Sequence, residues 1–392
     1  MIFPIFPSLL FAALLATSSA QSSPSSPPSS TWTEVTPTVA SATTDLAASA
    51  SPELSCNGSP LLCDRKYNNI TYMGAHDSAF LHDASTGESL AGNQNFNATI
   101  ALDSGIRFLQ AQVHNQEGTL ELCHTSCFLL DAGTLTAWLT KIRYWLDQNP
   151  NEVITILLVN SDNVDTSQFG AAFTASGLSN YGYTPQSPTG SSTNWPTLRT
   201  MITTNKRLVA FVTGITYTTT YPYLLNEFTH IFETPFTVLS LTGFNCTLDR
   251  PSGFPSFTAA LSAGMMPLMN HFADTEIALN IAIPNLLDIK TTNSPSTTKT
   301  GALGLHAANC LAQWGQKPIF ILVDFYDQGP AIDTANKLNG VTPTQNKPVP
   351  STTTTANNTA TTTHSGASLT RVSYATFASI ISSVLVVIFL SI

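Results

Sequence analysis

The chain has 392 residues, of which 43% are hydrophobic and only 10% are charged, and its formal charge is −9. This length allows one large domain or two ordinary ones, and the hydrophobic fraction supports a sizeable core, so a chain disordered throughout is excluded. The acidic balance and the lack of a basic cluster disfavour nucleic-acid binding. Charged residues fall well below the roughly 25% usual in soluble domains, so we expect glycans to contribute to solubility.

The first 53 residues have the pattern of an export signal followed by a linker. Residues 1–20 are apolar and end in small residues, with Ser18 and Ala20 at the positions that a signal peptidase favours. A retained anchor is the alternative, because no charged side chain precedes the apolar run. Residues 21–53 are rich in Ser, Thr and Pro, a composition that predicts an extended and O-glycosylated linker.

Apolar, β-branched runs alternate with helix-period patterns through the middle of the chain. In chain order, the pattern predicts strands at 69–75, 105–113, 119–124, 152–160, 207–214 and 318–326, and helices at 134–150, 195–202, 301–315 and 329–340. The helix at 134–150 has one apolar face and ends before Pro150. The last helix begins at Pro330 and ends at Gly340.

Strands that are repeatedly followed by helices predict a parallel sheet, either doubly wound or closed into a barrel. No G-x-G-x-x-G follows the first predicted strand, which removes the usual nucleotide-binding reason for an open sheet. Residues 54–341 fit a single α/β barrel of the TIM type, which is typically about 250 residues long. We therefore predict one TIM-type barrel domain between two disordered stalks.

The composition of residues 342–392 predicts a stalk followed by a lipid-attachment signal. Residues 342–366 are Thr-rich and should be glycosylated. Residues 367–392 follow small residues around Ser365 and run through a short spacer with Arg371 into an apolar tail, the layout of a glycosylphosphatidylinositol (GPI) signal. A retained transmembrane helix is the alternative. With no basic residue after the tail, we favour a GPI anchor and a place on the plasma membrane or cell wall.

Six cysteines lie inside the predicted domain, and an even number in an exported chain predicts disulfides. Short loops favour pairing Cys56 with Cys63 and Cys123 with Cys127, which leaves Cys246 with Cys310. A metal site is the weaker alternative, since neither a C-x-x-C pair nor a carboxylate cluster accompanies these cysteines. N-glycosylation motifs begin at five asparagines, Asn57, Asn69, Asn97, Asn245 and Asn357, and each motif is individually weak.

His76, His124 and Asp324 lie at or near the ends of predicted strands, which a barrel would bring to one face. Two histidines on one face supply a base and an acid with an unperturbed pKa of about 6.5, suited to proton transfer near neutral pH. Cleavage of a phosphodiester through a neighbouring hydroxyl needs such a pair. A carboxylate bonded to the base would fix its tautomer; Asp324 is our candidate, and Asp77 is the nearer alternative.

Six segments resemble a known family in order and approximate spacing. They read YMGAHDSAF, LDSGIRFLQAQV, LELCHTSC, NPNEVITILLVN, WPTLRTMITTNKRLVAFV and ILVDFYDQG. Together they resemble the X-domain family of phosphatidylinositol-specific phospholipase C, and most closely its secreted, GPI-anchored fungal and plant phosphodiesterases. The resemblance covers about residues 56–340. It implies a TIM-type barrel, a phosphoric diester hydrolase of lipid metabolism, and a glycerophospholipid or GPI-like phosphodiester as substrate.

The resemblance also implies roles for four residues. His76 matches the family's general base and His124 its general acid. Asp77 matches the acidic residue that follows the first histidine, and Asp324 matches a carboxylate on the last barrel strands. No cofactor is expected, and we expect a monomer.

The strand at 105–113 departs from the family pattern. Bacterial members have an aspartate and a phosphate-binding arginine where this chain has Gln110 and Gln112, and calcium-dependent eukaryotic members have acidic ligands there. A glutamine can donate to a phosphate oxygen but cannot neutralise it, so electrostatic stabilisation should be weaker. Calcium is not expected, because it requires several carboxylate or carbonyl oxygens. Arg107 lies on the other strand face, whereas His114 shares the face of the glutamines and is a candidate for the missing cation.

Three hypotheses follow for the function. The first is a metal-independent, PLC-like phosphodiesterase that uses His76 and His124. The second is a wall-associated barrel that binds a glycan or lipid head group with little or no turnover, because of Gln110 and Gln112. The third, a sphingomyelinase-D-like phosphodiesterase, is disfavoured by the missing acidic metal ligands. The other histidines are expected in the core or on the surface, although the run MNHF around His271 would fit the barrel mouth.

Overall fold

The computed structural model describes residues 54–278, 281–343 and 346–348. The predicted signal peptide, the linker, the GPI tail and most of the predicted stalk lie outside these residues. Within the described ranges, no helix combines the length and the apolarity needed to cross a bilayer.

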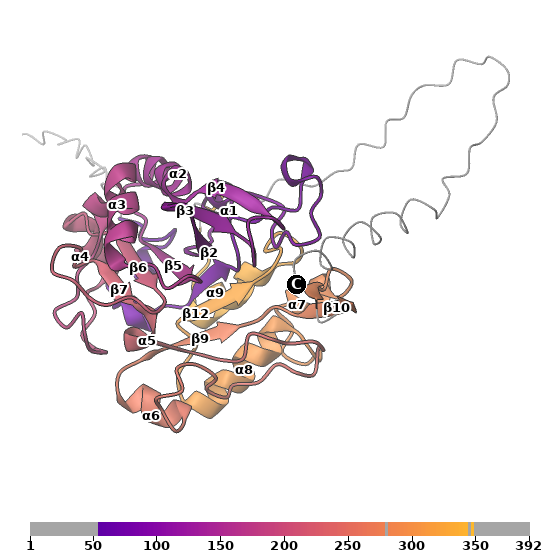
Figure 1. Ribbon diagram of the computed structural model, residues 1–392. Helices are drawn as coiled ribbons and strands as arrows, with labels where there is room; N and C mark the ends of the chain where they lie inside the picture. Colours follow the sequence, from indigo (N-terminus) through magenta and orange to yellow (C-terminus); the bar gives the residue numbers. More distant parts are fainter. Residues whose placement is uncertain (1–53, 279–280, 344–345, 349–392) are drawn as a thin grey trace, which may run out of the picture. The chain divides into compact units, whose positions relative to one another are not determined.

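A curled sheet of parallel strands forms the centre of the domain (Figure 1). Its strand order is β7-β6-β5-β2-β1-β12-β9-β8. The bounds are β1 Tyr72–Ala75, β2 Phe108–Gln116, β5 Ile154–Asn160, β6 Leu208–Val212, β7 Leu224–Asn226, β8 Ile231–Glu233, β9 Met266–Asn270 and β12 Phe320–Val323. The parallel order confirms the predicted (β/α) architecture. In the described residues, no ladder joins β7 directly to β8, and the one-turn helix α5 connects them instead.

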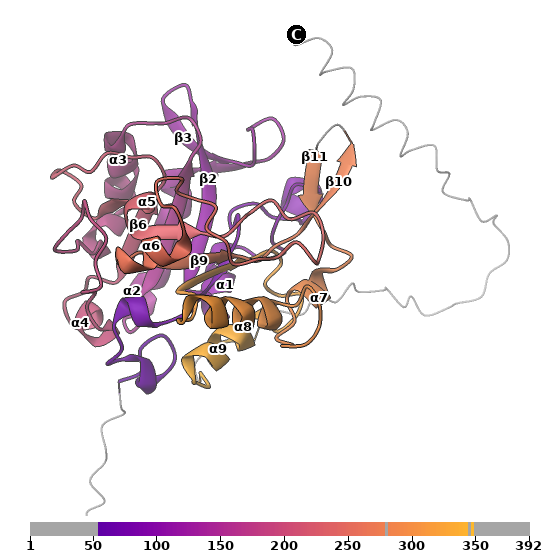
Figure 2. The same cartoon turned by 90° about the horizontal axis from the view of Figure 1, so that it is seen from below.

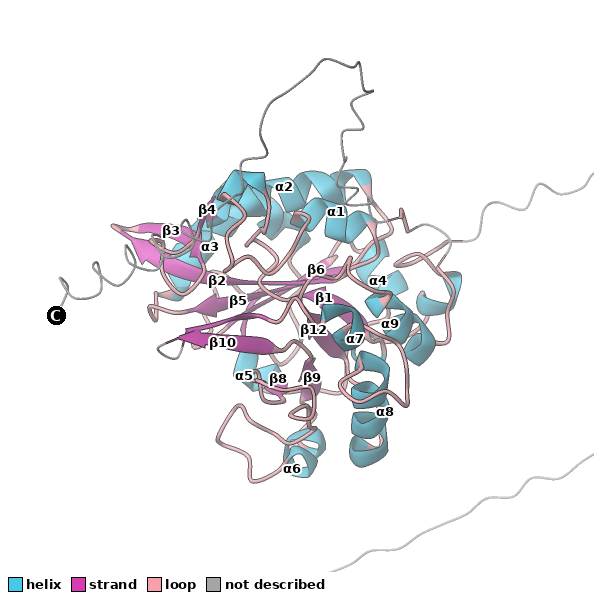
Figure 3. Ribbon diagram, turned by 90° about the vertical axis from the view of Figure 1, so that its right-hand side faces the viewer, coloured by secondary structure: helices cyan, strands magenta, loops and turns pink. Residues whose placement is uncertain are grey.

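Antiparallel strands extend this sheet at the carboxyl ends of its parallel strands. β3 Thr119–Cys123 pairs with the end of β2, and β4 Asp131–Thr134 pairs with β3. A separate hairpin, β10 Asp274–Ala278 with β11 Ile281–Pro284, follows β9. Figure 3 shows β3, β4 and β10 extending in the direction in which β2 and β5 point.

Helices pack around the outside of the sheet (Figure 1). The α-helices are α1 Ala98–Asp103, α2 Leu135–Gln148, α3 Thr166–Ser176, α4 Leu198–Thr203, α5 Glu227–His230, α6 Phe257–Ser262, α7 Ile289–Thr292, α8 Leu303–Trp314 and α9 Ala331–Asn339. Short 3-10 helices occur at Pro60–Leu62, Tyr67–Asn69, Ala84–Thr86 and Leu178–Tyr181. α2 shows why the sequence predicted its helix: Thr134 caps its amino end through a bond from Ala137 N, and its apolar face is buried.

Strand alternation divides the core into two clusters. Tyr72, Phe108 and Phe320 belong to the inner cluster, enclosed by the curled sheet. The intervening residues, such as Met73 and Leu109, belong to the outer cluster between sheet and helices. The inner positions are crowded: a Cβ on Gly74 would lie 2.5 Å from Cδ1 of Phe108. Two-residue periodicity therefore directs His76, Gln110, Gln112 and Asp324 to the inner face, like the aromatic residues that precede them on the same strands.

The three predicted disulfides are confirmed: Cys56–Cys63, Cys123–Cys127 and Cys246–Cys310. The glycosylation prediction is wrong at Asn57. This side chain is buried, its Nδ2 donates to Val153 O at 3.1 Å, and its Oδ1 accepts from Val153 N at 2.7 Å. The folded domain has no room for a glycan on that amide. Asn69, Asn97 and Asn245 are exposed and stay predictions, and Asn357 lies outside the described residues.

Candidate active site

His76 directly follows β1, and its position is set by the sheet. Its backbone N–H donates to Val323 O at 2.9 Å, continuing the ladder between β1 and β12. The same ladder delivers Asp324, the first residue after β12, and Nδ1 of His76 lies 2.8 Å from its Oδ1. The imidazole stacks on Phe272, with 3.6 Å between ring centroids and 8° between planes. A carboxylate and an aromatic ring thus fix the orientation of His76.

Asp77 lies between the two candidate histidines. Its Oδ2 is 3.6 Å from Nε2 of His76 and 3.4 Å from Nε2 of His124. The side chain is fully buried, and its backbone N–H donates to Oε1 of Gln110 at 2.6 Å. Because 3.6 Å is longer than a good hydrogen bond, Nε2 of His76 remains available to a substrate hydroxyl.

His124 follows β3 in a short loop that the Cys123–Cys127 disulfide closes. Its backbone N–H donates to Leu130 O at 3.0 Å, and its ring meets the edge of Phe80 with 5.2 Å between centroids. The cross-link and the backbone bond restrain the loop at both of its ends. The sequence predicted that His124 would reach the face of His76, and the structure brings the two together around Asp77.

Left-handed backbone conformations occur at this site. Asp77, Thr125 and Phe325 have φ values of 44°, 60° and 42°. One is a candidate site residue, and the other two directly follow His124 and Asp324. A residue other than glycine in this region costs of the order of 1–3 kcal/mol, and such strain gathers where function requires a particular geometry. The turns direct the side chains at three strand ends toward one centre.

The two glutamines form hydrogen bonds to other residues of the site. Oε1 of Gln110 accepts a hydrogen bond from the N–H of Asp77. Gln112 donates from Nε2 to Oδ2 of Asp77 at 3.1 Å and accepts from Thr125 N at 3.2 Å. Gln112 therefore ties Asp77 to the loop of His124. The predicted role of Gln110 and Gln112 in substrate binding stays a prediction.

His114 also lies on the inner side of β2, but its described partner is elsewhere. Its Nδ1 is 3.2 Å from Oδ1 of Asp162, whose Oδ2 accepts from Asn115 N at 2.7 Å. A carboxylate thus already neutralises any charge on His114. This weakens the prediction that His114 supplies the cation missing from β2. Arg107, as predicted, is turned away and pairs with Glu152 at 2.8 Å.

The electrostatics of the site favour a protonated His76. Burial lowers the pKa of His76, but the carboxylates of Asp77 and Asp324 outweigh burial and raise the pKa to about 9. For Asp77, burial favours the neutral acid, yet His76 and the hydrogen bond from His124 outweigh it and lower the pKa. The substrate-free site therefore contains an imidazolium next to buried carboxylates at neutral pH.

Sequence reasoning missed several residues of this site. Asn93 donates from Nδ2 to Oδ1 of Asp324 at 3.1 Å, and Gln94 donates to the backbone oxygens of His76 at 2.7 Å and Val323 at 3.1 Å. Burial, together with the charge of Asp324, raises the pKa of Asp274 to about 6. Asn93 and Gln94 lie in a loop without a periodic pattern. Asp274 and Phe272 follow β9, which the sequence did not predict as a strand.

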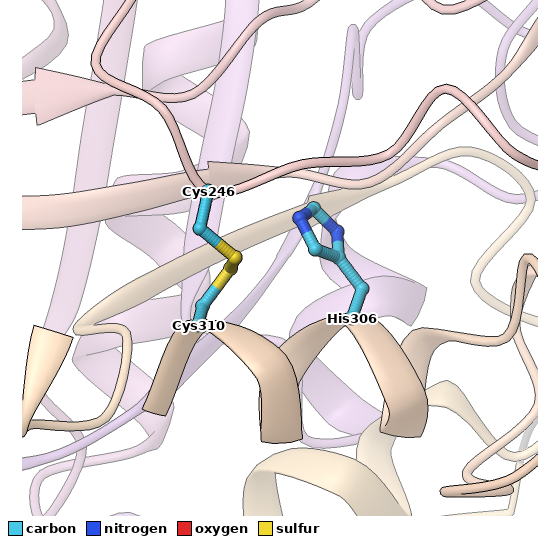
Figure 4. Close-up of side chains that lie close together, drawn as sticks. All are labelled: Cys246, His306 and Cys310. Carbon is cyan, nitrogen blue, oxygen red and sulfur yellow. A yellow bond between two sulfur atoms is a disulfide. The ribbon is translucent and has the colours of Figure 1, made fainter. Parts of the chain in front are cut away.

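A second cluster has the composition but not the chemistry of a metal site. Cys246, His306 and Cys310 lie close together in the described part of the chain (Figure 4). The two cysteines form a disulfide, so they offer no thiolates. Nδ1 of His306 lies 2.9 Å from Nδ1 of buried His271, and His271 Nε2 lies 2.9 Å from Thr292 O. These histidines are satisfied core residues, as predicted.

Comparison with known proteins identifies the family. Residues 62–339 match the protein family described as PI-PLC X 1. PI-PLC X domain-containing protein 1 of Arthroderma benhamiae is 38% identical over 291 residues, which are 74% of this chain and 90% of that protein. A protein of the same organism named Uncharacterized secreted protein is 38% identical over 294 residues, 73% of this chain and 64% of that protein.

Solved structures of low sequence identity resemble this chain. The phosphatidylinositol-specific phospholipase C of Listeria monocytogenes is 14% identical, covers 74% of this chain and 96% of its own, and gives a TM-score of 0.42. The F249X mutant of the Staphylococcus aureus enzyme is 16% identical, with coverages of 70% and 92% and a TM-score of 0.45. The family match over most of the barrel and the 38% identical relative show that this chain belongs to the PI-PLC X family.

Proposed function

We propose that this chain is a phosphoric diester hydrolase of the phospholipase C type, secreted and attached to the cell surface by a GPI anchor. Its proposed substrate is a phospholipid or a GPI-like phosphodiester, cleaved without a metal ion. The observation that carries the proposal is the position of Asp77 between His76 and His124, with Asp324 on the opposite nitrogen of His76. Family membership supports the reaction class, and the secreted relative supports export.

In the proposed mechanism, neutral His76 takes the proton from a substrate hydroxyl next to the phosphoester. Asp324 on Nδ1 holds the tautomer in which Nε2 is the acceptor and stabilises the imidazolium that forms. The hydroxyl oxygen attacks phosphorus, the bond to the leaving alcohol breaks, and His124 donates a proton to the leaving oxygen. Water then opens the cyclic phosphate with the two roles reversed, which restores both protonation states.

The charge on His76 bears on the missing arginine. With a pKa of about 9, His76 is mostly protonated at neutral pH before substrate binds. The reactive state requires neutral His76, so in that state neither His76 nor Gln110 nor Gln112 supplies a positive charge to the phosphate. Only the neutral fraction of His76 acts as a base, so weak binding charge and a small active fraction should both limit the rate at neutral pH.

Exposed apolar side chains near the carboxyl ends of the strands favour a substrate in a lipid surface. Phe128 is 83% exposed in the loop after His124, and Leu287 is 97% exposed just beyond the β10–β11 hairpin. Leu90, Leu129, Ile277 and Leu286 are also exposed. Figure 3 shows β4 and β10, which adjoin all of these residues except Leu90, beyond the same ends of the parallel strands. Such side chains lose contact with water when they enter a lipid interface.

The test is turnover by the purified full chain on phosphatidylinositol and on a GPI-type substrate, with EDTA present. We expect turnover that persists in EDTA and that His76→Ala and His124→Ala each abolish. His82→Ala is the matched control: Nδ1 of His82 bonds Ser89 O at 2.8 Å, and no described hydrogen bond or ion pair joins its side chain to His76, His124 or their carboxylates, so the rate should stay close to that of the wild type. Full activity in either of the first two variants would refute the acid–base pair.

A second candidate function is binding of a glycan or lipid head group with little turnover. The observation that favours it is the composition of the site: the described side-chain partners of Asp77 and Asp324 are histidine, asparagine and glutamine, with no lysine or arginine among them. Under this function the full chain binds head-group analogues without releasing phosphate esters. Gln112→Arg, which places a guanidinium beside Asp77, should then gain measurable turnover.

A further inference from the structure

An open groove lies at the end of the barrel opposite the candidate active site. It has a volume of about 690 Å³ and lies between α8, α9 and the segments that precede β1 and β12. Figure 2 shows α8 and α9 side by side, away from the β10–β11 hairpin. Because the site residues follow the carboxyl ends of their strands and this groove adjoins the amino ends, the two are separate. The volume is within the range of about 300–1,000 Å³ typical of small-molecule pockets.

One wall of the groove is apolar. It includes Ala307, Ala308 and Leu311 on α8, and Ile319 and Leu338 also line the groove. Leu311 is 41% exposed, which leaves a large apolar side chain in contact with water. The small side chains of α8 leave a channel along the helix that an alkyl chain would fill, removing this surface from water.

Two lysines add positive charge to the lining of the groove. Nζ of Lys317 donates to Asn339 Oδ1 at 2.8 Å and to Leu338 O at 3.4 Å, which uses two of its three protons. Burial and the neighbouring Arg65 lower the pKa of Lys317 to about 8. Lys337 also lines the groove. Within the described residues, no carboxylate forms an ion pair with either lysine.

A buried hydroxyl in the same lining has no partner. Oγ1 of Thr334 on α9 is buried, and no hydrogen bond to it exists in the described part of the chain. A buried hydroxyl without a partner is unfavourable, because it has lost its hydrogen bond to water. Lys317 uses two of its protons to cap the carboxyl end of α9. Its third proton and the hydroxyl of Thr334 have no such partner among the described residues.

We propose that this groove binds an anionic amphiphile, a single alkyl or acyl chain with a carboxylate or phosphate head. The head group lies at Lys317 and Lys337 and accepts a hydrogen bond from Thr334, while the chain lies along Ala307, Ala308 and Leu311. The proposal does not depend on the function proposed above, because the groove shares no residue with that site.

Isothermal titration calorimetry of the full chain with dodecyl phosphate and with laurate tests the proposal. We expect saturable 1:1 binding of at least one of them below its critical micelle concentration. Inorganic phosphate and dodecyl maltoside are the controls, and neither should bind comparably. Binding of dodecyl phosphate alone would identify a phosphate head group, and binding of laurate alone would identify a carboxylate. Equal binding of the maltoside would overturn the role of the charge, and binding of neither anion would overturn the site.

Variants locate the site. Lys317→Met should weaken binding about tenfold or more, the usual consequence of losing a charged hydrogen-bond partner, whereas Lys290→Met, at an exposed lysine on α7, should not. Ala308→Phe fills the channel without touching the cap of α9 and should also abolish binding. Asn69→Gln removes a predicted glycan from the rim and should leave binding intact or strengthen it. Unchanged affinity in both Lys317→Met and Ala308→Phe, with thermal unfolding confirming the fold, would refute the proposal.

Discussion

Oδ2 of Asp77 lies 3.4 Å from Nε2 of His124 while the same carboxylate faces His76. One buried carboxylate thus faces both candidate histidines, and it raises the pKa of His76. In Asp77→Asn, both histidines lose this negatively charged neighbour, and we expect kcat to fall by about 100-fold or more while the side-chain shape is kept. Asp131→Asn, at an exposed carboxylate on β4, is the control. An unchanged kcat would remove Asp77 from the mechanism.

The pH dependence of kcat/KM tests which histidine is the base. Because Asp77 and Asp324 raise the pKa of His76 to about 9, its neutral fraction grows as the pH rises toward 9. If neutral His76 is the base, kcat/KM should rise with pH and level off above about 9. In Asp324→Asn the rising limb should move to lower pH, because a charge that raises this pKa is lost. A limb that falls near pH 9 would instead assign His76 as the acid.

Asp274 should control substrate affinity in mildly acidic solution. Burial and Asp324 raise its pKa to about 6, so it is neutral below that pH and negative above it. An ionised Asp274 repels a phosphodiester, and KM should therefore increase as the pH rises from 5 to 7. We expect Asp274→Asn to have a lower KM at pH 7 that no longer changes over this range. Glu276→Gln, an exposed neighbour on β10, should behave like the wild type.

Much of the fold follows from local patterns. The six predicted strands correspond to β1, β2, β3, β5, β6 and β12, and the four predicted helices to α2, α4, α8 and α9. These segments have strong apolar periodicity and clear ends. β7 and β8 have three residues each, too short for a periodic pattern, and β9 contains Pro267 and two methionines. Their strand conformation depends on neighbours in the sheet.

The candidate site, like the fold, follows only in part from local sequence patterns. The positions of His76 and Asp324 follow from strand ends, because parallel neighbours bring their next residues together. The function of Gln112 as a link between Asp77 and Thr125 does not follow, since it requires the path of the loop after His124. Phe272 is similar. Its stacking on His76 depends on how β9 pairs with β12, a contact between segments far apart in the chain.

The disulfide beside His124 should matter more for catalysis than for folding. Cys123 and Cys127 are four residues apart, and a loop this short contributes about 2 kcal/mol to stability in the chain-entropy treatment. Without the bond, the loop of His124 can leave the left-handed turn at Thr125 and increase its distance from Asp77. We expect the double variant Cys123→Ser/Cys127→Ser to remain folded but to lose at least tenfold in kcat, since small displacements of a catalytic group have large effects on rate.

The Cys56–Cys63 pair provides the matched control for this prediction. It closes a similarly short loop, seven residues apart, in the segment before β1. Cys56→Ser/Cys63→Ser should lose a comparable free energy of unfolding, measured by urea denaturation, while the folded fraction keeps its kcat. If both double variants lose kcat equally, the effect on rate comes from general destabilisation. If only Cys123→Ser/Cys127→Ser loses it, the cross-link positions His124 against Asp77.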